Sequence, residues 1–149
     1  MEISQRWFDD IDVGEIFEAG SHEMSEERIL AFGREFDPQA FHTDPVAAAD
    51  TIYGGLIASG WHTGSVLMRL LTNTLGPSSL GSPGCDKLRW VSPVRPGDVL
   101  SLTITVLDKR PSSSKPDRGI LVYGHEMTNQ NGEVVMTLES TMFMLRRPR

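Results

Sequence analysis

Apolar and polar residues alternate through the second half of the chain. Over residues 100–106 every second side chain is aliphatic, and the residues between them are Ser or Thr. A period of two is typical of a strand that buries one face. Asn131-Gly132 separates two further stretches of this kind and is a strong signal for a tight hairpin. Strands are predicted over residues 85–94, 100–106, 120–127 and 134–144.

The first half has helical spacing after an opening strand over residues 15–24. Apolar side chains recur three and four residues apart from Ile29 to Phe36, and Ser25 is placed to cap the helix start. Pro38 disfavours helical geometry at the residue before it, so this helix should end near Phe36. Helices are predicted over residues 26–36, from Asp44-Pro45 to residue 49, and over residues 59–75, before Gly76-Pro77.

Length and composition predict one globular domain covering residues 1–149. The chain is 39% hydrophobic and 23% charged, which suits a domain with its own core. Helices followed by a run of antiparallel strands form an α+β pattern. A single cysteine, Cys85, excludes an internal disulfide and fits a reducing compartment. Residues 1–12 do not read as a signal peptide and no apolar run is long enough to span a bilayer, so a cytoplasmic protein without a membrane partner is expected.

Charge is distributed unevenly along the chain. The net charge is −6 and only 7% of residues are aromatic, a balance that argues against a nucleic-acid-binding protein. Acidic side chains concentrate before residue 86, whereas the remainder is net basic. The loop at residues 109–118 carries basic side chains that suit phosphate oxygens, although a solvated connection between strands explains them equally well. These side chains are Lys109, Arg110, Lys115 and Arg118.

Residues 36–45 hold the best candidates for chemistry. Asp37 and His42 lie five residues apart on a stretch interrupted by Pro38, where a loop can turn both side chains toward one point. A carboxylate and an imidazole that converge on one water molecule form an acid–base pair. Alternatively, Asp37 caps the end of the preceding helix and His42 is a half-buried histidine, which is the more common outcome for this spacing alone.

Glycines mark the start of the third predicted helix. Gly55 and Gly60 lie on either side of Ser59, just before the apolar helical stretch. Glycine lets a ligand approach the backbone closely, and the free N–H groups of a helix start can hold a developing negative charge. Gly55 and Ser59 are therefore predicted to contact substrate. The same glycines would also permit close packing of the central helix.

Residues 29–71 resemble the hydratase segment of the MaoC-like and R-specific enoyl-CoA hydratases. In that family an acidic residue is followed by four residues, a histidine and, six positions later, an alanine or serine. Here these residues are Asp37, His42 and Ala48. Residues 86–98, which end in Gly97-Asp98, resemble a second family motif at the entry to a strand. The resemblance therefore covers nearly the whole chain.

The resemblance implies a hot-dog fold, in which an antiparallel sheet wraps around a long central helix. It implies that Asp37 and His42 hold and activate the catalytic water, and that the Gly60 N–H forms an oxyanion hole. The implied enzyme is a hydro-lyase, an acyl-CoA hydratase or dehydratase that adds water reversibly to a 2-enoyl-CoA and gives a 3-hydroxyacyl-CoA. Coenzyme A would be part of the substrate, with no separate cofactor and no metal.

Three positions depart from the family pattern. The usual Asn-Pro between the acid and the histidine is absent, and a proline stands at position 38 instead. The usual His-Gly at the helix start is Ser59-Gly60. A serine that supports the acid in some hydratases aligns with Met68, which leaves Ser65, one turn earlier, as its candidate replacement.

Other functions fit the residues less well. Hot-dog thioesterases commonly carry a catalytic acid on the central helix, but residues 59–76 contain no acidic residue. A non-catalytic protein that binds acyl thioesters is the third candidate, and it would not need both Asp37 and His42. A metal site made of His42, Asp44 and His62 would lack supporting residues. Because a single hot-dog unit exposes a strand edge, a homodimer or a dimer-based higher oligomer is expected.

Overall fold

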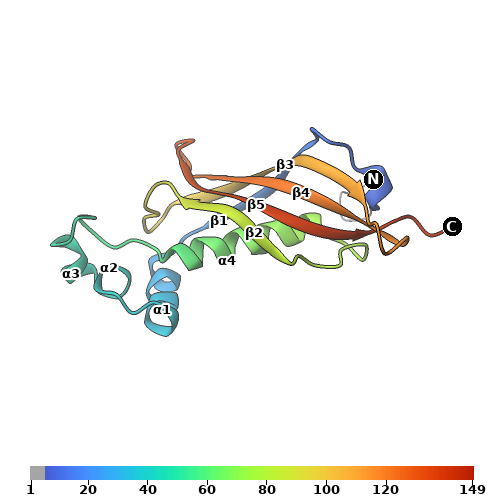
Figure 1. Ribbon diagram of the computed structural model, residues 1–149. Helices are drawn as coiled ribbons and strands as arrows, with labels where there is room; N and C mark the ends of the chain where they lie inside the picture. Colours follow the sequence, from blue (N-terminus) through green and yellow to red (C-terminus); the bar gives the residue numbers. More distant parts are fainter. Residues whose placement is uncertain (1–5) are drawn as a thin grey trace.

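The computed structural model describes residues 6–149, and one antiparallel sheet of five strands dominates it. The strand order is β1-β3-β4-β5-β2, and the helix α4 lies along one face of the sheet (Figure 1). A sheet wrapped around one long helix is the hot-dog arrangement, so the expected α+β fold is confirmed. The elements are β1 (Ile16–Glu23), α1 (Glu26–Phe36), α2 (Ala40–Thr43), α3 (Pro45–Ala49), α4 (Gly60–Leu71), β2 (Gly84–Trp90), β3 (Val99–Pro111), β4 (Arg118–Thr128) and β5 (Val134–Leu145), with short 3-10 helices at Phe8–Asp10 and Thr72–Thr74.

The strands follow the alternation of the sequence. Leu100, Leu102 and Ile104 of β3 point inward and are fully buried. The hairpin predicted at Asn131-Gly132 is confirmed, because Gly132 adopts a φ of +76° between β4 and β5. β2 ends at Trp90 rather than at residue 94. After Trp90 the N–H groups of Val91 and Ser92 both donate to the carbonyl oxygen of Val135, at 2.9 Å and 3.5 Å, so the regular ladder ends, and Pro93 has no N–H to continue it.

The helix caps explain where the first helices begin. The Ser25 hydroxyl accepts the N–H of Arg28 at 3.3 Å at the start of α1. The Asp44 carboxylate accepts the N–H of Val46 at 2.9 Å and starts α3. The central helix is shorter than predicted, because α4 ends at Leu71 and the next turn tightens to a 3-10 helix. The one-turn helix α2 was not predicted, because four residues carry no periodicity.

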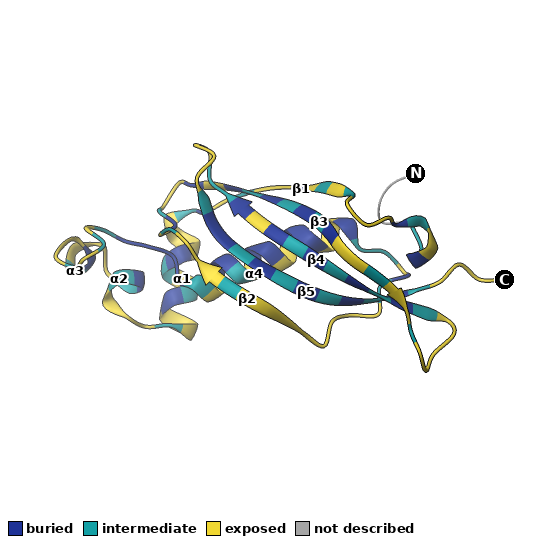
Figure 2. Ribbon diagram, turned by 45° about the horizontal axis from the view of Figure 1, so that its top comes forward, coloured by how far each residue is buried: buried dark blue, intermediate teal, exposed yellow. Residues whose placement is uncertain are grey.

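The core lies between α4 and the inner face of the sheet. Figure 2 shows buried residues alternating with more exposed ones along β3, β4 and β5, in front of the largely buried α4. Each fully buried aliphatic side chain contributes about 1.5–3 kcal/mol to folding. The helix supplies Val66, Leu67, Leu70 and Leu71 to this core.

The functional elements gather at one end of the molecule. Helices α1, α2 and α3 project beyond the sheet at one end, whereas the C-terminus and the hairpin between β3 and β4 lie at the other (Figure 1). In the part of the chain that the structure describes, the helices are too short and too polar to cross a membrane. The expectation about a signal peptide rests partly on residues 1–5, which lie outside that part.

Candidate active site

The turn between α1 and α3 brings Asp37 and His42 together. Asp37 ends α1, and the single turn of α2 reverses the chain so that His42 faces back toward Asp37. Gly33 of α1 makes this approach possible, because a Cβ at this position would lie only 2.6 Å from the carbonyl oxygen of His42. A glycine inside an otherwise helical stretch was the available sequence signal for this contact.

Both ring nitrogens of His42 are engaged. Nδ1 lies 2.7 Å from the carbonyl oxygen of Ile57, and Nε2 lies 3.2 Å from Oδ2 of Asp37. A carbonyl oxygen can only accept, so this partner assigns a hydrogen to Nδ1. Nε2 and Oδ2 form an ion pair when Nε2 also carries a proton. In that state the pair holds one transferable proton.

Three neighbours hold the Asp37 carboxylate. Gln39 Nε2 donates to Oδ1 at 2.7 Å, and Ser59 Oγ donates to Oδ2 at 2.8 Å. Burial is the largest single influence and raises the pKa of Asp37, but the two hydrogen bonds and the charge of His42 together lower it below its usual value. Asp37 is therefore ionised at neutral pH. About 23% of its side chain is exposed, so a water molecule can reach the carboxylate.

A cavity of about 420 Å³ opens beside His42 and the start of α4. Asp37 does not line it directly and contacts it through His42. Within residues 6–149 the N–H groups of Gly60 and Trp61 have no hydrogen-bond partner, as expected for the first turn of a helix. These donors can hold an oxyanion at the cavity wall. The lining includes His42, Tyr53, Gly60, Thr63, Trp90 and Val94.

The Trp90 ring packs directly against Gly60. Its Nε1 donates to the carbonyl oxygen of Gly60 at 2.9 Å, and a Cβ on Gly60 would overlap the ring. We expect Gly60→Ala to displace Trp90, lower the melting temperature by several degrees and reduce catalysis. Gly64→Ala on the same helix is the control, because its Cβ would make an ordinary 3.6 Å contact with Met136. Thermal unfolding and tryptophan fluorescence measure both effects, and equal behaviour of the two variants would contradict the expectation.

The comparisons with known proteins agree with this geometry. The family model described as "MaoC like domain" matches residues 12–127. The chain belongs to the MaoC-like domain family. It is 29% identical over 140 residues to the uncharacterized protein YdeM of Bacillus subtilis (strain 168), and the match covers 93% of this chain and 98% of YdeM.

Two solved structures that are similar to this MaoC-like chain are a dehydratase and a hydratase. A MaoC-like dehydratase from Rhodospirillum rubrum is 41% identical with a TM-score of 0.89, covering 97% of this chain and 99% of that chain. The R-hydratase PhaJ1 from Pseudomonas aeruginosa is 25% identical with a TM-score of 0.79, covering 95% of this chain and 86% of that chain.

Two of the positions that depart from the family pattern contact Asp37 in this MaoC-like chain. Gln39 and Ser59 both donate to its carboxylate. Ser65 does not replace the missing serine, because its hydroxyl donates to the carbonyl oxygen of Trp61, one turn back, at 2.7 Å. Sequence reasoning proposed Ser65 because that residue lies close along the helix. The actual contact joins residues 22 positions apart.

The other residues predicted to bind substrate lie in two different places. Gly55 is packed near the Arg95 guanidinium, which donates to the carbonyl oxygen of Tyr53, and does not line the cavity. Ser59 is 1% exposed and also lies outside the cavity lining. Lys109 and Arg110 lie at the end of β3, Lys115 in the connection after it and Arg118 at the start of β4, so three of these four residues, predicted in a loop, lie in strands. This end of the β3–β4 hairpin, called the β3–β4 loop below, lies opposite to α2 (Figure 1).

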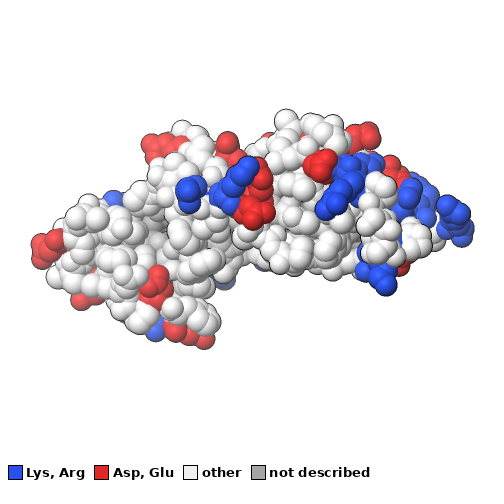
Figure 3. All heavy atoms as spheres, viewed as in Figure 1, with Lys and Arg blue, Asp and Glu red and all other residues white. Residues whose placement is uncertain are grey.

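Basic side chains gather at that far end (Figure 3). Lys109 Nζ donates to the carbonyl oxygen of Ile11 and lies 4.9 Å from the Phe8 ring centroid. Arg118 pairs with Asp117 at 2.8 Å. Two of the four basic side chains therefore have partners within their own chain, and the structure does not bring the loop to Asp37 and His42.

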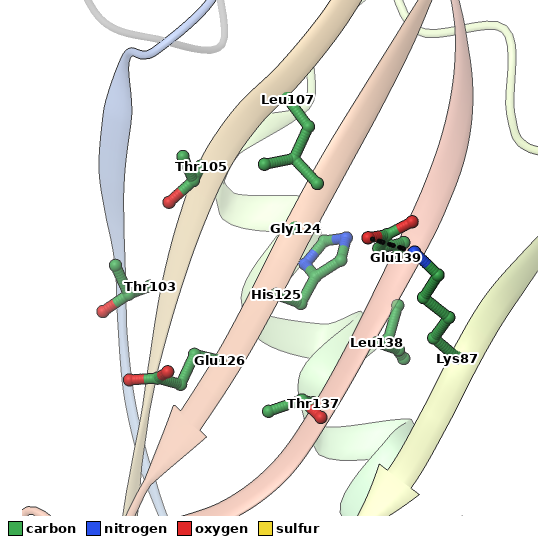
Figure 4. A pocket seen from close by; sticks show the side chains of 10 residues that line it. All are labelled: Lys87, Thr103, Thr105, Leu107, Gly124, His125, Glu126, Thr137, Leu138 and Glu139. Carbon is green, nitrogen blue, oxygen red and sulfur yellow. Dashed lines mark hydrogen bonds and ion pairs between the residues drawn. The ribbon is translucent and has the colours of Figure 1, made fainter.

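Two further hollows lie along the sheet. One, of about 410 Å³, is on the outer face, where Lys87 pairs with Glu139 beside threonine side chains (Figure 4). The other, of about 480 Å³, is mainly apolar and lies between α4 and β2. Over residues 6–149 no three His, Cys, Asp or Glu side chains are grouped as a metal site.

Proposed function

We propose that this protein adds water reversibly to the double bond of a 2-enoyl-CoA thioester. The contact between His42 Nε2 and Asp37 Oδ2, next to the free N–H of Gly60, carries the proposal. Membership of a family that includes hydratases and dehydratases supports it. No separate cofactor is needed, because the thioester carbonyl activates the double bond.

The transferable proton between Asp37 and His42 gives each of these two residues a role in the reaction. Asp37 Oδ2 takes a proton from a water molecule as the water oxygen bonds to the β-carbon. Electrons move to the thioester oxygen, and the Gly60 N–H stabilises the resulting enolate. His42 Nε2 then delivers its proton to the α-carbon. The proton on Asp37 passes to His42 across the 3.2 Å contact, which restores the starting state.

The experiment is a panel of enoyl-CoA and 3-hydroxyacyl-CoA esters with different acyl chains. Hydration removes the absorbance of the enoyl thioester without releasing free thiol. A thioesterase would release coenzyme A, which a thiol reagent detects. We expect no release, because α4 contains no acidic residue. Binding of the esters without either reaction would favour a non-catalytic acyl-thioester-binding protein.

We propose that the protein is a homodimer joined at the β2 edge. The sheet has two free edges, β1 and β2. Exposed apolar side chains lie beside β2, with Trp61 61%, Trp90 45% and Met68 47% exposed. An apolar surface next to an unpaired strand edge is the kind of surface that a second copy covers.

Met68→Glu should therefore convert the dimer to a monomer, because a buried unpaired charge would disfavour the interface. Light scattering at micromolar concentration should give about twice the chain mass of 16.5 kDa for the wild type and the single mass for the variant. Val13→Glu, which changes a similarly exposed side chain away from β2, is the control. A wild-type protein that is monomeric would exclude the proposal.

We propose that the β3–β4 loop holds coenzyme A phosphates, and that it does so for the active site of a second copy. Replacing Arg110, Lys115 and Arg118 by Gln should raise KM with little change in kcat, because these contacts are equal in the ground and transition states. Lys109 is left intact, because its contacts to Ile11 and Phe8 stabilise the fold. The difference in KM between the wild type and this triple variant should shrink as the salt concentration rises. An unchanged KM at low ionic strength would place the phosphate site elsewhere.

A further inference from the structure

Ser59 is the N-cap residue of α4, yet its hydroxyl does not cap the helix. A serine at this position normally accepts a backbone N–H from the first turn through its side chain. Here the backbone carbonyl oxygen of Ser59 accepts the N–H groups of His62 and Thr63, at 3.0 Å and 3.1 Å. The hydroxyl is therefore free for another partner.

That partner is the carboxylate of Asp37. The Ser59 hydroxyl donates to Oδ2 at 2.8 Å, and Ser59 is 1% exposed, so water does not compete for this contact. Oδ2 is also the oxygen that faces His42 Nε2 at 3.2 Å. Oδ2 of Asp37 therefore contacts both the buried Ser59 hydroxyl and the His42 imidazole.

Other neighbours cannot supply the same contact. Gln39 donates to the opposite oxygen, Oδ1, and lies at the exposed side. The Ser65 hydroxyl is satisfied within α4 by the Trp61 carbonyl oxygen. Of the titratable groups in residues 6–149, His42 is the one in contact with the Asp37 carboxylate.

We infer that Ser59 is a positioning residue that fixes the Asp37 carboxylate toward His42 and ties it to the helix start that bears the Gly60 N–H. Asp37 lies at the end of α1 and Gly60 at the start of α4, two elements that also touch where Phe32 stacks on His62. The hydroxyl joins the base to the oxyanion donor, and the two must act on adjacent atoms of one substrate. The kinetic part of this inference rests on the proposed hydratase function.

The test uses Ser59→Ala, Ser59→Thr and the control Ser65→Ala in the full chain. The hydroxyl stabilises the ionised carboxylate, so Ser59→Ala should raise the pKa of Asp37, measured by carboxyl-carbon NMR. Ser59→Thr keeps the hydroxyl and should restore the wild-type titration. Ser65→Ala should leave the titration unchanged. Ser59→Gly serves if the alanine variant is unstable, because glycine is tolerated at an N-cap.

Kinetics provide the second readout. Ser59→Ala should lower kcat roughly ten- to a hundredfold, the loss expected for a hydrogen bond to a charged group. KM should change little, because Ser59 does not line the cavity. The acidic limb of the rate profile should move to higher pH, and Ser59→Thr should return it.

The two proposals fail separately. If the wild type hydrates no enoyl-CoA ester, the proposed function is wrong, while the NMR titration still tests the Ser59–Asp37 contact. If the alanine and glycine variants leave the titration of Asp37 unchanged, the inference about Ser59 is wrong, whatever the activity. An active wild type with a shifted titration but unchanged kcat in Ser59→Ala would also overturn the positioning role.

Discussion

Asp37→Asn and His42→Ala should each lower kcat/KM for hydration by at least about a hundredfold, the usual loss for a positioned acid or base. Asparagine keeps the size of the side chain but cannot take a proton from water. Alanine at position 42 removes both the contact to Oδ2 and the hydrogen bond to Ile57. Steady-state rates on the best enoyl-CoA ester measure the effect.

Asp50→Asn is the matched control, because Asp50 is an exposed carboxylate at the end of α3 and lies outside the cavity. It should keep wild-type rates. Circular dichroism checks that the folds are unchanged. The central assignment is wrong if either active-site variant retains near-normal hydration while folded.

The free energy of unfolding should fall steeply as the pH drops from about 6.5 toward 4. Burial lowers the pKa of His62 and of His125 to about 4, from the ordinary value of 6.5. Between these values the unfolded chain binds protons that the folded chain excludes, so acid favours unfolding. Each histidine contributes a slope of about 1.4 kcal/mol per pH unit.

The surroundings of the His62 and His125 rings explain why the folded chain does not bind these protons. His62 stacks on Phe32 with ring centroids 4.9 Å apart, and Nε2 of His125 lies 2.7 Å from the hydroxyl of Ser140. Neither ring has a carboxylate partner in the part of the chain that the structure describes. Charging either ring would therefore place an unpaired cation in the core.

Urea denaturation at pH 7.5 and pH 5.0 measures the loss. At pH 5 the two histidines together should cost roughly 4 kcal/mol, a large part of a typical domain's stability. His62→Leu and His125→Leu should each flatten the pH dependence in this window. The lowered pKa of Glu15 acts only below its ordinary value of 4.5, so its effect is separable. A free energy of unfolding that is equal at both pH values would rule out this account.

Local patterns predicted most of the fold. Alternation in β3 and the cap at Ser25 depend on neighbouring residues, and both are present in the structure. The spacing of Asp37 and His42 across a proline-interrupted turn allowed the two side chains to meet, and the structure brings them together. The resemblance supplied the roles of the pair, which spacing alone left open.

Contacts between distant residues could not be predicted in this way. The Ser59 hydroxyl reaches Asp37 only after α4 has packed on the sheet, so no local pattern marks it. The basic side chains of residues 109–118 were picked out by their composition, which does not say how far from Asp37 and His42 they lie. Strand β3 has 13 residues, which carry the chain about 40 Å, so the loop after it ends far from α2.

The close packing of Trp90 on Gly60 also constrains how this sequence can evolve. Any side chain at position 60 would occupy the space of the indole, so the two positions cannot vary independently. A relative that places alanine at position 60 must carry a smaller residue at position 90, and it loses the hydrogen bond to the carbonyl oxygen of residue 60. We therefore expect positions 60 and 90 to be substituted together among homologues, because each residue limits the space that the other can occupy beside the Gly60 N–H.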